Sequence, residues 1–127
     1  MSFKNRINLL KQKISEKGLD GIYITNLTNV RYLTGFTGSA GSVLIIDKQQ
    51  YFFTDGRYIE QSKEQVQDCQ VYIVGSGHVK AIEKNKLLKK GMKIGFESTS
   101  VSVSMYEIFS KVLSNINWIK TSGIVEK

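Results

Sequence analysis

Proline, histidine, cysteine and arginine are scarce in this sequence of 127 residues. It has no proline, one histidine (His78) and one cysteine (Cys69). One cysteine cannot form an intramolecular disulfide, and one histidine excludes a metal site built from several imidazoles. No apolar run reaches the ~18 residues that a membrane-spanning helix needs, and the N-terminus lacks the apolar core of a signal peptide. We therefore expect a protein of the reducing cytoplasm that does not bind membranes.

The length and composition fit a single globular domain. Hydrophobic residues make up 41% of the chain and charged residues 23%, which is far from the composition of a disordered segment. The sequence has no internal repeat, no low-complexity tract and no internal linker. A domain of this size buries roughly two-thirds of the surface that its unfolded chain exposes.

An excess of basic residues raises the question of nucleic-acid binding. The 18 basic and 11 acidic side chains give a net charge of +7, but only Arg6, Arg31 and Arg57 are arginines. Bidentate recognition of bases and phosphates favours arginine. The lysines are spread along the chain except between Lys80 and Lys93, where an inward apolar side predicts a solvated helix face. We therefore expect no nucleic-acid partner, and salt-dependent binding of polyanions by this stretch is a rival hypothesis.

Hydrophobic periodicity predicts a chain in which helices and strands alternate. The first helix is expected to begin after Ser2 as its N-cap. The last helix is expected to begin at Ser100 or Ser102, and Ser104 and Glu107 have the spacing of a capping box. The helices predicted between them cover 27–34, 57–66 and 78–90.

The predicted strands are short and apolar. They cover 19–25, 42–47, 50–54, 69–74, 92–96 and 116–120. The strands 42–47 and 50–54 are separated by a short polar link, which predicts a hairpin. Strands that alternate with helices favour a largely parallel sheet covered on both faces, to which the hairpin adds one antiparallel strand.

Patterns for catalysis or metal binding are absent from the sequence. A catalytic metal site takes about three protein ligands, and none of the 11 carboxylates stands in an HExxH or EF-hand pattern. Most carboxylates are expected on solvated helix faces or in turns. Cys69 opens a predicted strand, which favours a buried structural thiol. His78 follows a glycine turn at the start of a helix, which favours capping or solvent exposure.

Three glycines with the spacing Gly35-x-x-Gly38-x-x-Gly41 need a separate explanation. This spacing is neither that of a dinucleotide-binding loop nor that of a P-loop. Phosphate-binding loops also run from a strand into a helix, whereas these glycines follow a predicted helix and lead into a strand. We therefore predict a tightly packed connection that needs positive φ or close backbone approach, rather than a ligand site.

The segment Thr54-Asp-Gly-Arg-Tyr58 joins a predicted strand to a predicted helix. Asp55 and Gly56 are typical of a turn, and Thr54 or Asp55 is suited to cap the helix. Arg57 lies at the end of a sheet strand, where α/β proteins usually bind ligands. A guanidinium at this place can hold a carboxylate or a carbonyl by a forked hydrogen bond.

Both of these segments resemble landmarks of a known family. Asn29-Val-Arg-Tyr-Leu-Thr-Gly-Phe-Thr-Gly-Ser-Ala-Gly41 resembles the Asn-x-x-Tyr-Leu-Thr-Gly-Phe-x-Gly-Ser-x-Gly segment of Xaa-Pro aminopeptidases and Xaa-Pro dipeptidases. Thr54-Asp-Gly-Arg-Tyr58 resembles a second landmark of the same proteins. The resemblance covers essentially the whole chain, and it is to the N-terminal domain that these enzymes share with creatinase and prolidase.

The resemblance implies a three-layer α/β fold of ribonuclease-H-like type, with a mostly parallel mixed sheet, one hairpin and helices on both faces. It assigns residues 1–121 to this domain and 122–127 to the start of a linker to a catalytic domain that this sequence lacks. In the family, that pita-bread domain carries two Asp, one His and two Glu, which bind two divalent metal ions, often manganese. We therefore expect no catalytic residue, no bound cofactor and no metal ligand in this chain, and no peptide cleavage by it alone.

The resemblance also implies a supporting role within a proline-specific metallopeptidase. The domain is expected to pack on its own catalytic domain, to support a homodimer and to close the cleft that takes peptides with proline in second position. Arg57 matches an arginine on the cleft-facing side of relatives, so it is the candidate substrate-binding residue, with Asp55 and Tyr58 holding the turn. Aminopeptidase and strict dipeptidase activity are both open. A rival hypothesis is a stand-alone binding or oligomerisation module without peptidase activity.

Overall fold

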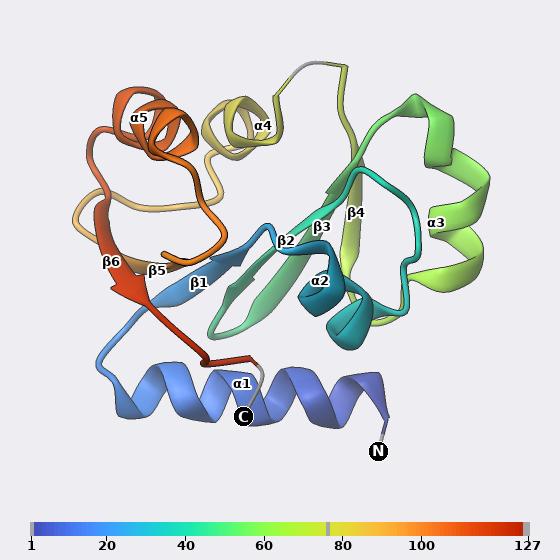
Figure 1. The fold of residues 1–127 in the computed structure, drawn as a ribbon, viewed down its shortest axis with the longest axis horizontal. Helices are drawn as coiled ribbons and strands as arrows, with labels where there is room; N and C mark the ends of the chain where they lie inside the picture. The colour runs from blue at the N-terminus through green and yellow to red at the C-terminus, as the bar shows by residue number, and fades with distance from the viewer. Residues whose placement is uncertain (1, 76, 126–127) are drawn as a thin grey trace.

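The computed structural model describes residues 2–75 and 77–125, in which helices and strands alternate (Figure 1). The helical elements are α1 (Phe3–Glu16), α2 (Leu27–Thr34), the 3-10 turn η1 (Gly56–Tyr58), α3 (Ile59–Gln65), α4 (His78–Lys84) and α5 (Val103–Val112). The strands are β1 (Gly21–Ile24), β2 (Ser42–Ile46), β3 (Gln49–Thr54), β4 (Gln70–Ile73), β5 (Lys93–Glu97) and β6 (Asn117–Thr121). Every predicted strand is present within a few residues of its expected bounds, and β2 and β3 form the predicted hairpin.

All of these strands belong to one sheet in the order β4-β3-β2-β1-β5-β6. β2 runs antiparallel to both β1 and β3, whereas the other neighbouring strands pair in parallel. This confirms the mixed, mostly parallel sheet with one hairpin, as expected for a ribonuclease-H-like domain. Because β2 alone is reversed, the carboxyl ends of the other five strands meet at one edge of the sheet.

Helices cover both faces of the sheet, and each face has its own apolar core (Figure 1). Alternation along the strands divides the side chains between the two faces. On β1, Ile22 packs in the core beneath α1 and α2, whereas Tyr23 packs beneath α4 and α5. On β2, Val43 and Leu44 are divided in the same way. Each fully buried aliphatic side chain of this kind stabilises the fold by about 1.5–3 kcal/mol.

The ends of the helices agree with expectation at α1 and partly at α5. The Ser2 side chain accepts a hydrogen bond from the Asn5 backbone N–H at 3.1 Å, which confirms it as the N-cap of α1. Of the two starts predicted for α5, Ser102 is the N-cap, and its hydroxyl accepts from Met105 N–H at 3.1 Å. The capping box starting at Ser104 is wrong, because Ser104 lies inside the helix. Within the described residues no helix has the length and apolarity needed to cross a membrane.

Helix α4 is shorter than predicted, since it ends at Lys84 rather than near residue 90. The Asn85 side chain donates to the Ala81 carbonyl at 2.8 Å, which competes with the backbone hydrogen bonds of a continuing helix. Lys86 follows with φ of 52°, a left-handed conformation that ends the helix. The lysines from Lys80 to Lys93 are all exposed, as expected for a solvated face.

Glu97, the last residue of β5, is a buried carboxylate and does not fit the expectation of solvated acidic residues. Only 5% of its surface is exposed. Its Oε1 atom accepts hydrogen bonds from the backbone N–H groups of Thr25 and Asn26 at 3.1 Å each, and Oε2 accepts one from the Asn29 amide. Asn26 is the N-cap of α2. The carboxylate therefore joins the end of β1 and the start of α2 to β5, where the helix dipole and N–H donors favour negative charge.

The segment after β6 turns back toward α1 (Figure 1). Ile124 and Val125 are buried in the core beneath α1, and the Lys13 ammonium donates to the Ile124 carbonyl at 3.2 Å. The division between a domain at 1–121 and a linker at 122–127 stays a prediction. Residues 126–127 of that linker lie outside the described residues.

Replacement of the buried carboxylate, Glu97→Gln, is expected to lower the free energy of unfolding by about 1–3 kcal/mol. The amide nitrogen would stand where an oxygen now accepts, so a buried donor would lose its partner. Urea denaturation followed by circular dichroism measures the change. Glu107→Gln on the exposed side of α5 is the matched control, with an expected change within about 0.5 kcal/mol. Equal stability of the two variants would contradict the role given to Glu97.

Candidate functional site

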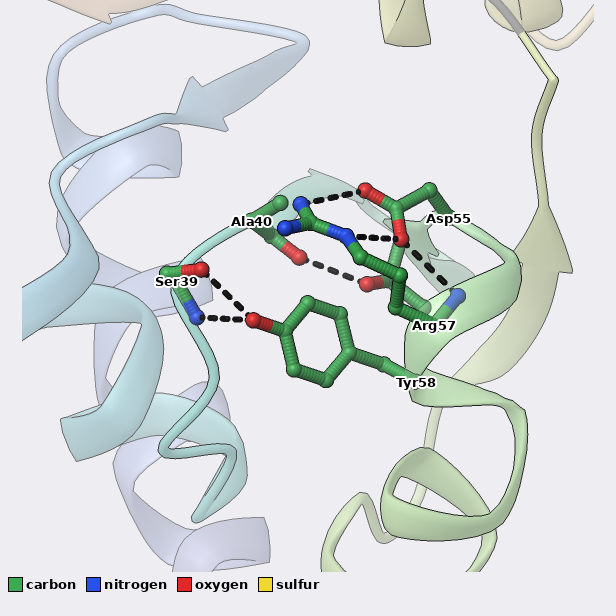
Figure 2. A network of polar contacts seen from close by, with 6 residues as sticks. Ser39, Ala40, Asp55, Arg57 and Tyr58 are labelled. Atoms are coloured by element: carbon green, nitrogen blue, oxygen red, sulfur yellow. Dashed lines mark hydrogen bonds and ion pairs between the residues drawn. The ribbon is translucent and has the colours of Figure 1, made fainter.

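A paired arginine and aspartate stand at the carboxyl end of β3 (Figure 2). Asp55 is the N-cap of η1, and its Oδ1 atom accepts from the Arg57 backbone N–H at 3.0 Å. The same carboxylate accepts from the Arg57 guanidinium twice, at 3.0 Å from Nε and at 2.8 Å from Nη2. Of the two capping residues that the sequence offered, Asp55 is the one used. The turn therefore fixes the direction of the guanidinium as well as the start of the helix.

The pairing keeps both groups charged. The side-chain hydrogen bond from Arg57 is the main cause that lowers the pKa of Asp55, and the same bond raises the pKa of Arg57. The Arg57 side chain is nevertheless 66% exposed, and its Nη1 atom has no partner among the residues that the structure describes. A pre-aligned, exposed edge of N–H donors can bind a carbonyl or a carboxylate oxygen.

Tyr58 connects this turn to the glycine-rich segment (Figure 2). Its phenolic oxygen accepts from the Ser39 backbone N–H at 3.1 Å and lies 2.5 Å from the Ser39 hydroxyl. These hydrogen bonds lower the pKa of Tyr58, with the hydroxyl contact as the larger cause. The structure thus brings Asp55, Arg57 and Tyr58 together, while their part in substrate binding stays a prediction.

Close packing explains the spacing of the three glycines, as the sequence predicted. Gly35 caps α2 with φ of 85°, a conformation that favours glycine. A Cβ atom on Gly38 would collide with the Phe36 ring and would lie 2.9 Å from Tyr58 Cε1. The Thr54 hydroxyl also donates to the Ala40 carbonyl at 2.6 Å. Sequence reasoning missed this link because nothing local marks two segments 14 residues apart as partners.

His78 has a role that the sequence did not indicate. It is the first residue of α4 and makes no side-chain capping bond, so the expected capping role is wrong. Its ring is half-buried, and Nδ1 lies 2.7 Å from the Ser42 hydroxyl, which in turn lies 2.9 Å from the Tyr23 hydroxyl. The three residues come from α4, β2 and β1, so only the folded sheet brings them together.

The remaining candidates for chemistry do not form a reactive site. Cys69 is partly buried against the core beneath α1, and burial is the main cause that raises its pKa to about 12. The thiol therefore stays protonated at neutral pH, which suits a structural role. Across residues 2–75 and 77–125, no three His, Cys, Asp or Glu side chains are grouped so that they could hold a metal ion. The dinuclear metal centre that the family resemblance implies does not fit these residues.

The substitution Gly38→Ala is expected to destabilise the domain by about 1–3 kcal/mol, because the added methyl group overlaps the Phe36 and Tyr58 rings. Thermal unfolding followed by circular dichroism measures the change. Gly56→Ala is the matched control, since a Cβ atom at Gly56 meets nothing within 4 Å. The control is expected to leave stability unchanged or slightly higher. A Gly38→Ala variant as stable as the control would refute the packing explanation.

Known proteins share both the sequence and the fold of this chain. Residues 6–127 match the family described as the creatinase/prolidase N-terminal domain. The chain is 37% identical over 123 residues to the peptidase YqhT of Bacillus subtilis, which corresponds to 96% of this chain and 35% of that protein. It therefore spans about a third of the length of this relative.

Two solved structures show the same fold. An Xaa-Pro dipeptidase from Bacillus anthracis superposes with a TM-score of 0.90 at 34% identity, over 98% of this chain and 35% of that chain. The isolated N-terminal domain of the cytoplasmic peptidase PepQ from Mycobacterium tuberculosis superposes with a TM-score of 0.84 at 33% identity, over 96% of each chain. The chain belongs to the creatinase/prolidase N-terminal domain family.

Proposed function

We propose that this chain is the non-catalytic N-terminal domain of a longer, proline-specific metallopeptidase of the cytoplasm, either an Xaa-Pro aminopeptidase or an Xaa-Pro dipeptidase. The observation that carries this proposal is the length of the relatives. The match to the Bacillus anthracis Xaa-Pro dipeptidase covers 98% of this chain but only 35% of the enzyme. Catalysis then belongs to a following domain, which would supply the two divalent metal ions, with manganese expected.

Within that enzyme, the domain packs on its own catalytic domain, contributes to a homodimer and closes one side of the substrate cleft. The geometry at Arg57 supports this role. The guanidinium is exposed but held by Asp55 in two hydrogen bonds, so little side-chain entropy is lost when it binds a peptide. Because Asp55 offsets its charge, Arg57 recognises a carbonyl or carboxylate oxygen at the far end of the peptide by hydrogen-bond geometry rather than by net charge.

The size of the natural gene product tests the first part of the proposal. An additional catalytic domain of about 200–250 residues gives a product of roughly 40 kDa. An immunoblot of the source cell, with an antibody raised against this domain, measures that size. A product of the size of this chain alone would contradict the proposal and favour a stand-alone binding module.

The variant Arg57→Ala in the two-domain enzyme tests the role in the cleft. We expect kcat/KM to fall about tenfold for Xaa-Pro peptides long enough to reach Arg57, which is the loss of about one charged hydrogen bond. Peptides too short to reach it should be cleaved at the normal rate. Steady-state kinetics over a series of peptide lengths measures both.

Arg31→Ala is the matched control for Arg57→Ala, because Arg31 is an exposed arginine on α2 away from the β3 turn. It should leave kcat/KM unchanged at every length. Size-exclusion chromatography checks that both variants keep the oligomeric state of the parent. If Arg57→Ala has unchanged kcat/KM across all lengths in a correctly assembled enzyme, Arg57 serves only to hold the turn.

A further inference from the structure

An open, mostly apolar cavity of about 650 Å³ lies between α4, α5 and the edge of the sheet where β1 ends and β2 begins. Its apolar lining includes Leu27 and Ile108, which are 42% and 50% exposed. Helix α5 buries Phe109 beneath it, whereas half of the surface of Ile108, the preceding residue, stays exposed. The cavity is large enough for a small organic molecule.

A chain of hydrogen bonds fixes one donor in this cavity. Burial raises the pKa of Tyr23 far above its usual value, so Tyr23 keeps its proton, and Ser42 is its only hydrogen-bond partner among the described residues. The Tyr23 hydroxyl therefore donates to Ser42 Oγ, and we assign the Ser42 hydroxyl as the donor to His78 Nδ1, 2.7 Å away. Burial is also the main cause that lowers the pKa of His78, so the ring is neutral at pH 7. A neutral ring that accepts at Nδ1 carries its proton on Nε2.

Two polar atoms of the cavity are left without partners by the described residues. No described residue accepts a hydrogen bond from the Nε2 atom of His78. The Thr25 Oγ1 atom is buried and likewise has no hydrogen-bond partner, although a buried hydroxyl without a partner costs roughly 1–3 kcal/mol. Both residues line the cavity.

The charged side chains that line the cavity are both basic, although the Asp55 carboxylate outside the lining also acts on His78. Lys80 on α4 and Lys111 on α5 are the charged side chains of its lining, and both are exposed. Neither forms an ion pair with a described residue. The cavity therefore offers an apolar lining, two hydrogen-bonding groups without partners among the described residues, and two ammonium groups. These features complement an anion that accepts hydrogen bonds and carries an apolar group.

We propose that the cavity between α4 and α5 binds a small organic carboxylate, with its apolar body between the two helices and its carboxylate accepting from His78 Nε2 and Thr25 Oγ1. Lys80 and Lys111 attract the negative charge. The site is distinct from the Arg57 turn, although residues 39–42 border both. A free acid and the C-terminal residue of an apolar peptide share this chemistry, and the experiment below distinguishes them.

The experiment is a titration of the 127-residue chain followed by two-dimensional NMR at pH 7. The isolated domain is a suitable sample because the corresponding domain of the Mycobacterium tuberculosis relative was solved by itself. The probe is 4-phenylbutyrate, with 4-phenylbutanamide as its neutral analogue. We expect saturable shifts of the Thr25, Ser42 and His78 signals with a dissociation constant of ~1 mM or below. The amide should bind at least tenfold more weakly.

Two variants and one control variant test where the probe binds. Ile108→Glu places a carboxylate in the cavity and should abolish binding, whereas Val103→Glu, on the same helix at a position 78% exposed, should bind normally. Thr25→Val removes the unpaired hydroxyl at equal volume. This variant should fold as stably as the parent or more so, yet bind the probe at least threefold more weakly.

Three results would overturn the proposal: no saturable shift up to 10 mM probe (~tenfold above the expected constant), equal affinity for the acid and the amide, or unchanged binding in Ile108→Glu. If Thr25→Val binds the probe with unchanged affinity, the carboxylate does not contact Thr25, and the proposed placement is wrong. A parallel titration with the peptide Ala-Pro-Phe identifies the source. Tighter binding of the peptide than of 4-phenylbutyrate assigns the site to peptide C-termini, and the reverse assigns it to free acids.

Discussion

The packing of the Phe36 ring against the end of β3 is the constraint on which the functional edge of this domain depends. The ring is 1% exposed and meets Phe52 and Tyr58 in edge-to-face contacts with centroids 4.8 and 5.3 Å apart. Gly38 lies so close to it that no side chain fits there. Residues 35–41, which follow α2, therefore pack against the turn after β3. A hydrogen bond from the Thr54 hydroxyl and one to the Tyr58 oxygen hold this segment in place. Both the Arg57 turn and the apolar cavity border on this one segment.

The topology of the sheet explains why both features lie at the same edge. With only β2 reversed, the carboxyl ends of β1, β3 and β5 lie at the same edge of the sheet, with the start of β2 between those of β3 and β1. β3 leads into Asp55 and Arg57, β1 leads into Thr25, and β5 ends in Glu97. Ligands of open α/β sheets bind beyond the carboxyl ends of the strands. Here Glu97 joins β5 to the start of α2, and Arg57 presents an exposed guanidinium. Thr25 lines the cavity, and its buried hydroxyl has no partner among the described residues.

The net charge of +7 has little part in this arrangement. The lysines of the stretch from Lys80 to Lys93 are exposed and solvated, and single surface charges of this kind contribute little to stability. At the carboxyl edge of the sheet, the charges with fixed partners include Arg57 with Asp55 at the turn, and Glu97 with the backbone at the start of α2.

The sequence by itself determined the order of the elements, the hairpin, the two glycine-containing landmarks and the capping of α1, because periodicity, turn residues and caps act over a few residues. It also indicated that Arg57 lies at the end of a strand, and that the glycines serve close packing. Tertiary structure alone decided that Glu97 is buried and that Tyr23, Ser42 and His78 form a hydrogen-bond chain. These features join residues 19 to 72 positions apart, and no local pattern records which strand or helix will stand opposite a given side chain once the sheet has formed.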